Sequence, residues 1–257
     1  MEKETFTNGS NFLVRNSRNG FTEYVDQPGL VQNEGAKYSS HVNGQFARLF
    51  GTEGNDWLTA PAQSTAKWII TAGEGDDYMQ GTDNAANLML GQEGDDYMHG
   101  SDTFQDHLYG GTGNDKIFGY GGNDKLKGED GDDEILGGDG NDKLFGGKGD
   151  DQLQGGNGDD LLLAGNGSNM YYGGAGADSF GLMKKHEQNV IGDFNHEEGD
   201  QLLIRKRHID SVEVSFLGNL GANGEAQFWL ESEMGLTGIQ TKAGTTVDDI
   251  MGAIKAM

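Results

Sequence analysis

A gapless run of six nonapeptides fills residues 110–163 and constrains the fold of this chain more than any other feature. Each copy has Gly at its first and fourth positions, Asp at its sixth and a large aliphatic residue at its eighth. A short fixed period is typical of a solenoid, in which every copy adds one structural unit and contacts only its neighbours. The chain is therefore expected to be organised around a repeating coil.

The two parts of each nonapeptide predict different backbone conformations. The first six residues are rich in Gly, which allows positive φ and close approach of another backbone, so they are expected to form loops. The last three predict a short strand whose middle side chain points inward. Two nonapeptides then make one turn of a right-handed parallel β-roll, an all-β fold. The expected core residues are Leu108, Ile117, Leu126, Ile135, Leu144, Leu153 and Leu162.

The sixth-position aspartates are expected to stack in two ladders, because alternate copies lie on the same side of the roll. The first ladder is predicted to contain Asp56, Asp77, Asp96, Asp115, Asp133, Asp151 and Asn169. The second is predicted to contain Asp106, Asp124, Asp142, Asp160 and Asp178. Stacked like charges repel, and the Gly loops expose carbonyls beside them. Calcium takes about six to eight oxygen ligands in flexible geometry, so roughly eight ions are expected between neighbouring turns.

Irregular copies predict weaker sites at both ends of the repeat. Between residues 51 and 109 the register is interrupted several times, and Asn169 replaces the charged carboxylate with an amide. A metal-free Gly/Asp solenoid is the alternative. It is disfavoured because no Lys or Arg stands in register to neutralise the aspartates.

Composition excludes several classes of protein. The net charge of −24 argues against a nucleic-acid partner, and the absence of Cys excludes disulfides and thiolate metal sites. No apolar run is longer than four residues, so no membrane span is expected. The residues from Met1 to Glu4 lack a basic region followed by an apolar one, and no cleaved N-terminal signal is predicted.

The flanks of the repeat predict capping segments. We expect an N-terminal cap over residues 1–50, the roll over 51–181 and a β-rich C-terminal cap over 182–257. Strands are predicted at 189–194, 201–205, 212–217 and 227–231, and an amphipathic helix at 247–257. A basic run at 205–208, with Lys184 and Lys185, is interpreted as a solvated face, or as a contact for the acidic roll or a polyanionic glycan.

The repeats at 110–163 resemble the RTX (hemolysin-type calcium-binding) family, for which this nonapeptide is the known signature. The resemblance covers about half the chain, residues 51–181. The segment from Gly173 to Phe180, followed by Ile191 to Ile204, also resembles the end of RTX repeats in serralysin-type proteases and alginate epimerases. Within it, Asp193 and Asp200 match acidic positions and are candidate ligands.

The resemblance implies a ligand set and a location. The sixth-position residues would be side-chain ligands, and loop carbonyls would complete the calcium shell. The residues whose backbone carbonyl oxygens the resemblance implies as calcium ligands are Gly110, Thr112, Gly119, Gly121, Gly128, Asp130, Gly137, Asp139, Gly146, Lys148, Gly155 and Asn157. It also implies export by a type I ABC secretion machinery with an uncleaved C-terminal signal. The chain would fold on extracellular calcium, as a secreted or cell-surface protein.

No catalytic constellation is recognised in the sequence. His186-Glu187 and His196-Glu197 lack the second His of a zinc protease, and no GxSxG motif is present. We therefore expect a non-enzymatic interaction or adhesion module whose partner is a cell-surface polysaccharide or protein. The alternative is a polysaccharide-modifying or hydrolytic exoprotein, or its calcium-binding C-terminal module, with an unrecognised active site. An ice-binding roll is disfavoured by charged third loop positions, and a pore-forming toxin by the lack of a long apolar segment.

Overall fold

The computed structural model describes residues 13–16, 21–24, 37–41, 46–60, 62, 64–182, 187–204, 212–220, 225–232, 235–242 and 244–256. The basic run at 205–208 and the pair Lys184–Lys185 lie outside these residues. Within the described chain, no helix has the length and apolar character needed to cross a membrane.

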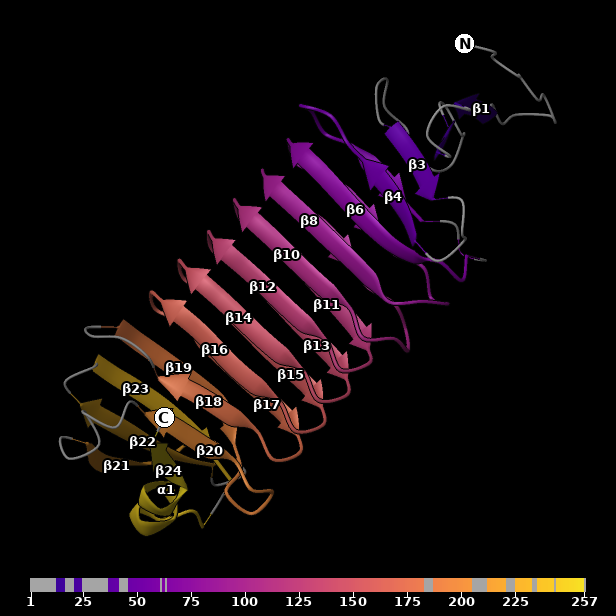
Figure 1. Ribbon diagram of the computed structural model, residues 1–257. Coiled ribbons are helices and arrows are strands. Elements are labelled where there is room, and N and C mark those ends of the chain that lie inside the picture. The colour runs from indigo at the N-terminus through magenta and orange to yellow at the C-terminus, as the bar shows by residue number, and fades with distance from the viewer. Residues whose placement is uncertain are drawn as a thin grey trace.

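Two long sheets stack as a flattened right-handed β-roll of about eight turns (Figure 1). Sheet A contains, in spatial order, β1 (Leu13–Asn16), β2 (Phe21–Tyr24), β3 (Lys37–His41), β4 (Phe46–Phe50), β6 (Lys67–Glu74), β8 (Asn87–Glu93), β10 (His107–Thr112), β12 (Lys125–Asp130), β14 (Lys143–Lys148), β16 (Leu161–Asn166), β18 (Ser179–Leu182), β20 (Gln201–Ile204) and β24 (Ile254–Ala256). Sheet B contains β21 (Glu213–Leu220), β22 (Glu225–Ser232), β23 (Gly235–Thr241), β19 (Glu187–Phe194), β17 (Met170–Ala175), β15 (Gln152–Asn157), β13 (Glu134–Asp139), β11 (Lys116–Gly121), β9 (Tyr97–His99), β7 (Tyr78–Gln80) and β5 (Trp57–Thr59).

The register of the roll follows the sequence period. Leu126 of β12 lies between Leu108 of β10 and Leu144 of β14, each one turn away, and the pairing is parallel. Ile117 and Ile135 are paired in the same way in sheet B. Successive strands therefore alternate between the two sheets, which confirms the parallel β-roll predicted from the repeat.

The strands of the regular repeat are longer than predicted. In the region of consecutive nonapeptides they run for six residues, as in Lys116–Gly121, and include the first three positions of the next copy. Parallel pairing resumes at the second and third positions, where Gly111 pairs with Glu129 and Thr112 with Asp130. The chain leaves the sheet only at the fourth position, where Gly131 has φ +146° and lies against the backbone of Gly113.

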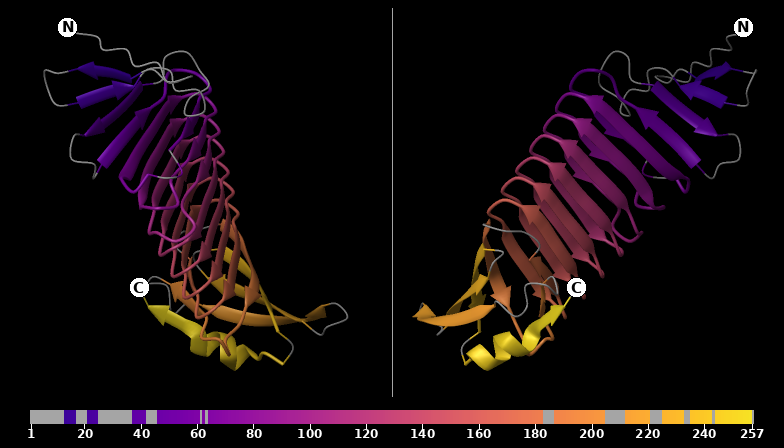
Figure 2. Two further views of the ribbon diagram at one scale, coloured as in Figure 1. Left: turned by 90° about the vertical axis from the view of Figure 1, so that its right-hand side faces the viewer. Right: turned by 60° about the vertical axis from the view of Figure 1, so that its left-hand side comes forward.

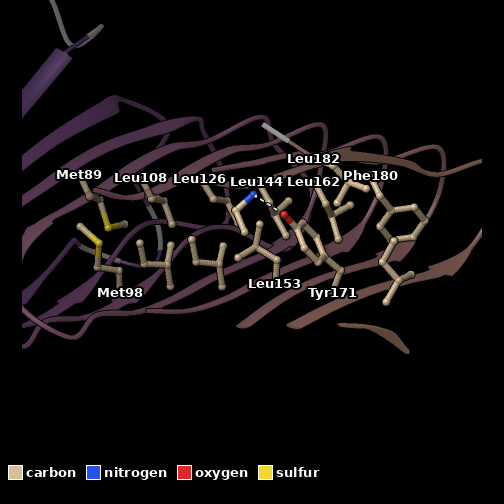
Figure 3. Packing of buried hydrophobic residues seen from close by; sticks show 14 of the residues in the cluster. Met89, Met98, Leu108, Leu126, Leu144, Leu153, Leu162, Tyr171, Phe180 and Leu182 are labelled. Carbon is tan, nitrogen blue, oxygen red and sulfur yellow. Dashed lines mark hydrogen bonds between the residues drawn. The ribbon is translucent and has the colours of Figure 1, made fainter. Parts of the chain in front are cut away.

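A single row of side chains per sheet fills the interior (Figure 3). All seven predicted core residues are buried, with exposed fractions of 0–1 %. Tyr171 and Phe180 widen the core near the C-terminal end, and the Tyr171 hydroxyl accepts a hydrogen bond from Ala164 N at 3.3 Å. Because this core is thin, burial of apolar surface is limited and the loops must contribute to stability.

The two ends of the roll carry different additions (Figure 2). At one end, β1–β4 form an antiparallel extension of sheet A that joins the roll through parallel pairing of β4 with β6. At the other end, β21–β23 continue sheet B beyond β19. The strands predicted for the C-terminal cap did not include β23.

The predicted C-terminal helix is too long. Helix α1 (Val247–Ala253) is capped by Thr246, whose hydroxyl accepts a hydrogen bond from Asp249 N, but it ends at Ala253. Ile254–Ala256 instead form β24, which pairs with β20 through Leu202 and Ile254. Backbone pairing with an open sheet edge has overridden the amphipathic pattern, and Gly252 weakens the helix at this point.

Outward aromatic residues gather on sheet B. Trp57, Tyr78, Tyr97 and Phe118 form a continuous row of ring contacts, with centroid separations from 4.4 to 5.7 Å. Trp57 remains 46 % exposed and Tyr97 36 % exposed.

Candidate metal sites along the roll

Two ladders of side chains run along the edges of the roll, and they include every sixth-position residue that the sequence predicted for them. Each backbone N–H donates to the Oδ1 atom of the sixth-position residue in the next turn. In the first ladder Asp115 N donates to Asp133 at 2.8 Å, and Asp133 N donates to Asp151 at 3.1 Å. In the second, Asp124 N donates to Asp142 at 2.7 Å, and Asp142 N donates to Asp160 at 2.7 Å. Each carboxylate thus bridges two turns.

Within the described residues, ten ladder aspartates each keep one buried carboxylate oxygen without a hydrogen-bond donor. These residues are Asp56, Asp77, Asp96, Asp115, Asp124, Asp133, Asp142, Asp151, Asp160 and Asp178. Their side chains are at most 4 % exposed. A buried acceptor without a partner is costly, and a charged one more so. The same defect repeated turn after turn indicates that a cation, or a proton, completes these positions.

The first glycine of each loop opens the space beside the unpaired oxygen. A Cβ atom on Gly155 would stand 2.2 Å from Asp160 Oδ2 and 2.6 Å from the carbonyl oxygen of Gly173, one turn further on. Gly119 and Gly137 face the same pair of oxygens in their own turns. A side chain cannot occupy this space, which a carboxylate oxygen without a donor and a backbone carbonyl oxygen both border. Such a cradle fits a hard cation.

Burial also raises the pKa of these carboxyl groups. Desolvation, aided by the charges of neighbouring aspartates, raises the pKa of Asp115 and of Asp124 to about 8. The same cause raises the pKa of Asp133 to about 7 and that of Asp142 to about 6. The pKa of Asp106 is also raised, chiefly by burial. Without a counter-ion, much of each ladder would therefore hold protons near neutral pH.

The ends of the ladders are satisfied by protein groups instead. Asp106 accepts hydrogen bonds at Oδ1 from Asn87 N and Nδ2, and at Oδ2 from Ser101 N and Oγ. Asn87 Nδ2 also donates to the loop carbonyls of Thr82 and Ala85, so the amide supplies donors to a carboxylate and to backbone carbonyls together. Asp106 was predicted as a metal ligand. Because both of its carboxylate oxygens already accept hydrogen bonds, it needs a metal ion less than the other predicted aspartates do.

At both ends of the first ladder, protein groups also take part of the role expected of a cation. Asp56 Oδ2 accepts from Thr52 N at 2.5 Å and from Thr52 Oγ1 at 3.0 Å, which leaves only its Oδ1 unpaired. At the far end of the first ladder, Asn169 accepts from Asp151 N at 2.8 Å, and Asn189 accepts from Asn169 N. The first ladder therefore ends in neutral amides.

The two candidate ligands beyond the repeat lie in different places. Asp200 extends the second ladder, because its Oδ1 accepts from Asp178 N at 2.9 Å and its Oδ2 from Asn195 N at 2.7 Å. Asp193 instead caps the backbone of Gly173 and Gly174, accepting one hydrogen bond on each oxygen at 2.9 Å.

The third-position residues contribute carbonyls that already accept hydrogen bonds. Gly113 N donates to the carbonyl oxygen of Asp130, and Gly131 N to that of Lys148, both at 2.8 Å. Thr112, Asp139 and Asn157 are engaged in the same way by the fourth-position glycine of the preceding turn. Gly121 occupies the same third position of its own copy. A carbonyl oxygen has two lone pairs, so these groups retain one acceptor site each.

Sequence reasoning missed a second set of ladders, formed by the fifth-position residues. Asp132 N donates to Asn114 Oδ1 at 2.8 Å, and Asp150 N donates to Asp132 Oδ1 at 2.7 Å. These bonds run opposite to those of the sixth position, because the acceptor belongs to the preceding turn. The signal was present, since every copy from 110 to 163 has Asn or Asp at its fifth position.

The donor set of each site is mixed. Among the described residues, no three His, Cys, Asp or Glu side chains converge on one point. A metal in the cradle would therefore be held by one or two ladder carboxylates together with backbone carbonyls. That set contains only oxygen, which suits calcium better than zinc or copper.

Gly128→Ala is expected to destabilise the calcium-loaded roll by about 1–3 kcal/mol, the usual range for overpacking. The added Cβ would stand 1.8 Å from Asp133 Oδ2, so the carboxylate must leave the ladder. Gly54→Ala is the matched control, because no atom lies within 4 Å of its Cβ position. Thermal unfolding in excess calcium measures both variants. If the two variants were destabilised equally, the space beside Asp133 Oδ2 would not be a calcium site.

Comparison with known proteins agrees with this geometry. The family model described as the RTX calcium-binding nonapeptide repeat matches four times, at residues 47–60, 102–135, 120–153 and 145–180. The matches from 102 onward contain every aspartate that the sequence predicted for the second ladder. No curated protein matches the chain.

Proposed function

Since this chain is a calcium-binding protein of the RTX type, we propose that calcium is the switch that folds it outside the cell, where it acts as a non-enzymatic interaction or adhesion module. One observation carries the proposal: ten buried aspartates each lack a donor for one oxygen. Calcium supplies the positive charge and coordination that these oxygens lack.

The ladders explain why folding and binding would be coupled. Each ladder aspartate donates from its N–H to one turn and accepts at Oδ1 from the other, so its side chain is placed only when three turns are stacked. In the unfolded chain the same aspartates are far apart in space. Calcium binding then favours the folded chain alone, which is the condition for stabilisation by mass action.

The expected calcium affinity lies between the calcium concentrations inside and outside the cell. Extracellular calcium modules bind with dissociation constants of ~10⁻⁴–10⁻³ M. A site at the tight end contributes ~1.4 kcal/mol at millimolar calcium, and roughly eight sites together would supply a free energy comparable to that of folding. At submicromolar calcium this contribution disappears. A chain that is unfolded inside the cell and folded outside it suits export by a type I ABC machinery.

The surface of the roll supports an interaction role. The row formed by Trp57, Tyr78, Tyr97 and Phe118 leaves apolar surface exposed on sheet B. Contiguous apolar surface of this kind commonly marks a contact with a partner. The partner class proposed here is a cell-surface polysaccharide or protein.

A calcium titration followed by circular dichroism tests the proposal. The chelator-treated chain at neutral pH should give a coil spectrum and change cooperatively to a β spectrum between micromolar and millimolar calcium. Magnesium is the control, and it should have little effect because it demands tighter octahedral geometry and dehydrates reluctantly. A chelated sample that keeps its full β spectrum and melting temperature would contradict the proposal.

A further inference from the structure

The outer face of sheet A carries a patch of cations in a strongly acidic chain. Its six residues lie on the adjacent strands β10, β12 and β14 (Figure 1). His107, Lys125 and Lys143 are paired in one row across these strands. Tyr109, Lys127 and Phe145 form the neighbouring row. We call these six residues the cationic patch.

Acidic side chains are absent from the two outward rows of sheet A that contain the cationic patch. The two outward rows that pass through β4, β6, β8, β10, β12, β14 and β16 run from Arg48 to Leu161 and from Phe50 to Leu163. Neither described row contains Asp or Glu, although the chain has 42 acidic residues. The lysines therefore have no acidic neighbour within these two rows, and Glu129, two residues after Lys127 on β12, lies just outside them.

The lysines of the cationic patch have no ion-pair partner within the described residues. Lysines elsewhere do, as Lys116 pairs with Glu134 at 2.7 Å and Lys148 with Asp130 at 2.6 Å. Lys125, Lys127 and Lys143 take part in no such pair. Unpaired cations in a chain of net charge −24 indicate a surface reserved for an external anion.

Aromatic rings hold part of this charge in place. The Lys127 ammonium lies 5.3 Å from the centre of the Tyr109 ring and 5.7 Å from that of Phe145. Lys125 lies 5.9 Å from the Tyr109 ring. Cation–π contacts of this kind restrict the lysine side chains while leaving their N–H donors free. Preorganised donors bind an anion with a smaller loss of side-chain entropy.

The surroundings select the shape of the anion. The central strand of the patch, β12, continues into Glu129 and Asp130 at one edge of the roll, and the aspartate ladders follow the edges. A lipid bilayer or a nucleic-acid duplex would cover these edges together with the patch. A single extended chain can lie on two rows of side chains and cross strands that are about 4.8 Å apart.

We propose that the cationic patch binds an extended acidic polysaccharide that runs along the roll and pairs its carboxylates with Lys125, Lys127 and Lys143. This inference rests on the proposed function, because the three strands are aligned only in the folded roll. It deepens that function by naming the partner as a uronate-bearing glycan.

Fluorescence anisotropy with labelled hyaluronan oligosaccharides tests the proposal on the full chain in millimolar calcium. K125Q/K127Q/K143Q should bind about tenfold or more weakly than the unchanged chain, since three exposed ion pairs are lost. K116Q/K148Q/K242Q removes the same charge from three lysines that have carboxylate partners, and should bind within about twofold of the unchanged chain. The same oligosaccharide with its carboxylates amidated should not bind.

The outcomes separate this inference from the proposed function. Circular dichroism in calcium must show the β spectrum for all three proteins. If the unchanged chain folds but does not bind the oligosaccharide, or if both triple variants bind equally, the inference is wrong and the calcium switch stands. Tighter binding to phosphatidylserine vesicles or duplex DNA than to the oligosaccharide would also overturn it. If calcium produces no β spectrum, the proposed function fails and the inference fails with it.

Discussion

Asp133→Asn is expected to destabilise the calcium-loaded protein by ~3 kcal/mol and to lower its melting temperature by roughly 5–10 °C. The amide can still accept the hydrogen bond from Asp115 N, as Asn169 does from Asp151 N at 2.8 Å. What is lost is the charged, unpaired Oδ2. Asp133 adjoins one turn on each side, so we expect about two calcium steps to weaken, each by ~1.4 kcal/mol.

The neighbouring residue provides a matched control for that variant. Asp132→Asn removes the same charge from an exposed fifth position, where Asn114 shows that an amide is tolerated. It should change the melting temperature in calcium only slightly. Asp56→Asn, at the end of the same ladder, should have about half the effect of Asp133→Asn, because it adjoins one turn only. Equal shifts for Asp133→Asn and Asp132→Asn would show that the charge of the sixth position is not used to hold calcium.

Acidification is expected to have opposite effects on the calcium-free and calcium-loaded roll. The folded-state pKa of Asp115 is about 8 and that of Asp133 about 7, both well above the ordinary pKa of an aspartate side chain. The calcium-free roll gains stability from these protonated groups. That stability is fully present below the pKa that these aspartates have in the unfolded chain. It is lost as the pH rises through the folded-state pKa values of the ladder aspartates, about 6–8. The chelated chain should therefore gain β structure between about pH 8 and pH 5.

Calcium must displace the same protons, so its affinity should fall over that range. Each proton released per bound ion lowers the affinity about tenfold for each unit of pH below the pKa. Calcium titrations by circular dichroism at several pH values, at constant ionic strength, measure the midpoint. Proton release on calcium addition to an unbuffered sample gives an independent count. A midpoint that does not change with pH would show that the ladder carboxylates are already ionised before calcium arrives.

Much of the fold follows from the repeat itself, because the pairing partner of each residue is set by the length of one turn. Leu126 must pair with Leu144 once two copies make a turn, and the eighth positions must then be buried. The membership of both aspartate ladders follows from the same arithmetic. The length of the strands did not follow, because pairing through the second and third positions depends on the positive φ of particular loop residues such as Gly131.

The ends of the ladders were not predictable from the period. Ser101 and Asn87 satisfy Asp106 only because an interrupted register brings them beside it in space. The repeat predicted that Asp106 lies in the second ladder, but not that both of its carboxylate oxygens already accept hydrogen bonds. The end of α1 is a similar case, because the amphipathic pattern of Val247 to Ile254 carries no information about the open edge of β20.

The opposed directions of the fifth- and sixth-position hydrogen bonds have a mechanical consequence. Every interface between turns is closed by bonds that both turns donate, as Asp115 N donates forward to Asp133 and Asp132 N donates back to Asn114. No turn is held from one side only, so tension on the chain ends is resisted equally at successive interfaces. Within the regular repeat, each turn that detaches releases two nonapeptides of chain, an extension of about 60 Å. This part of the roll would lengthen under force in uniform steps.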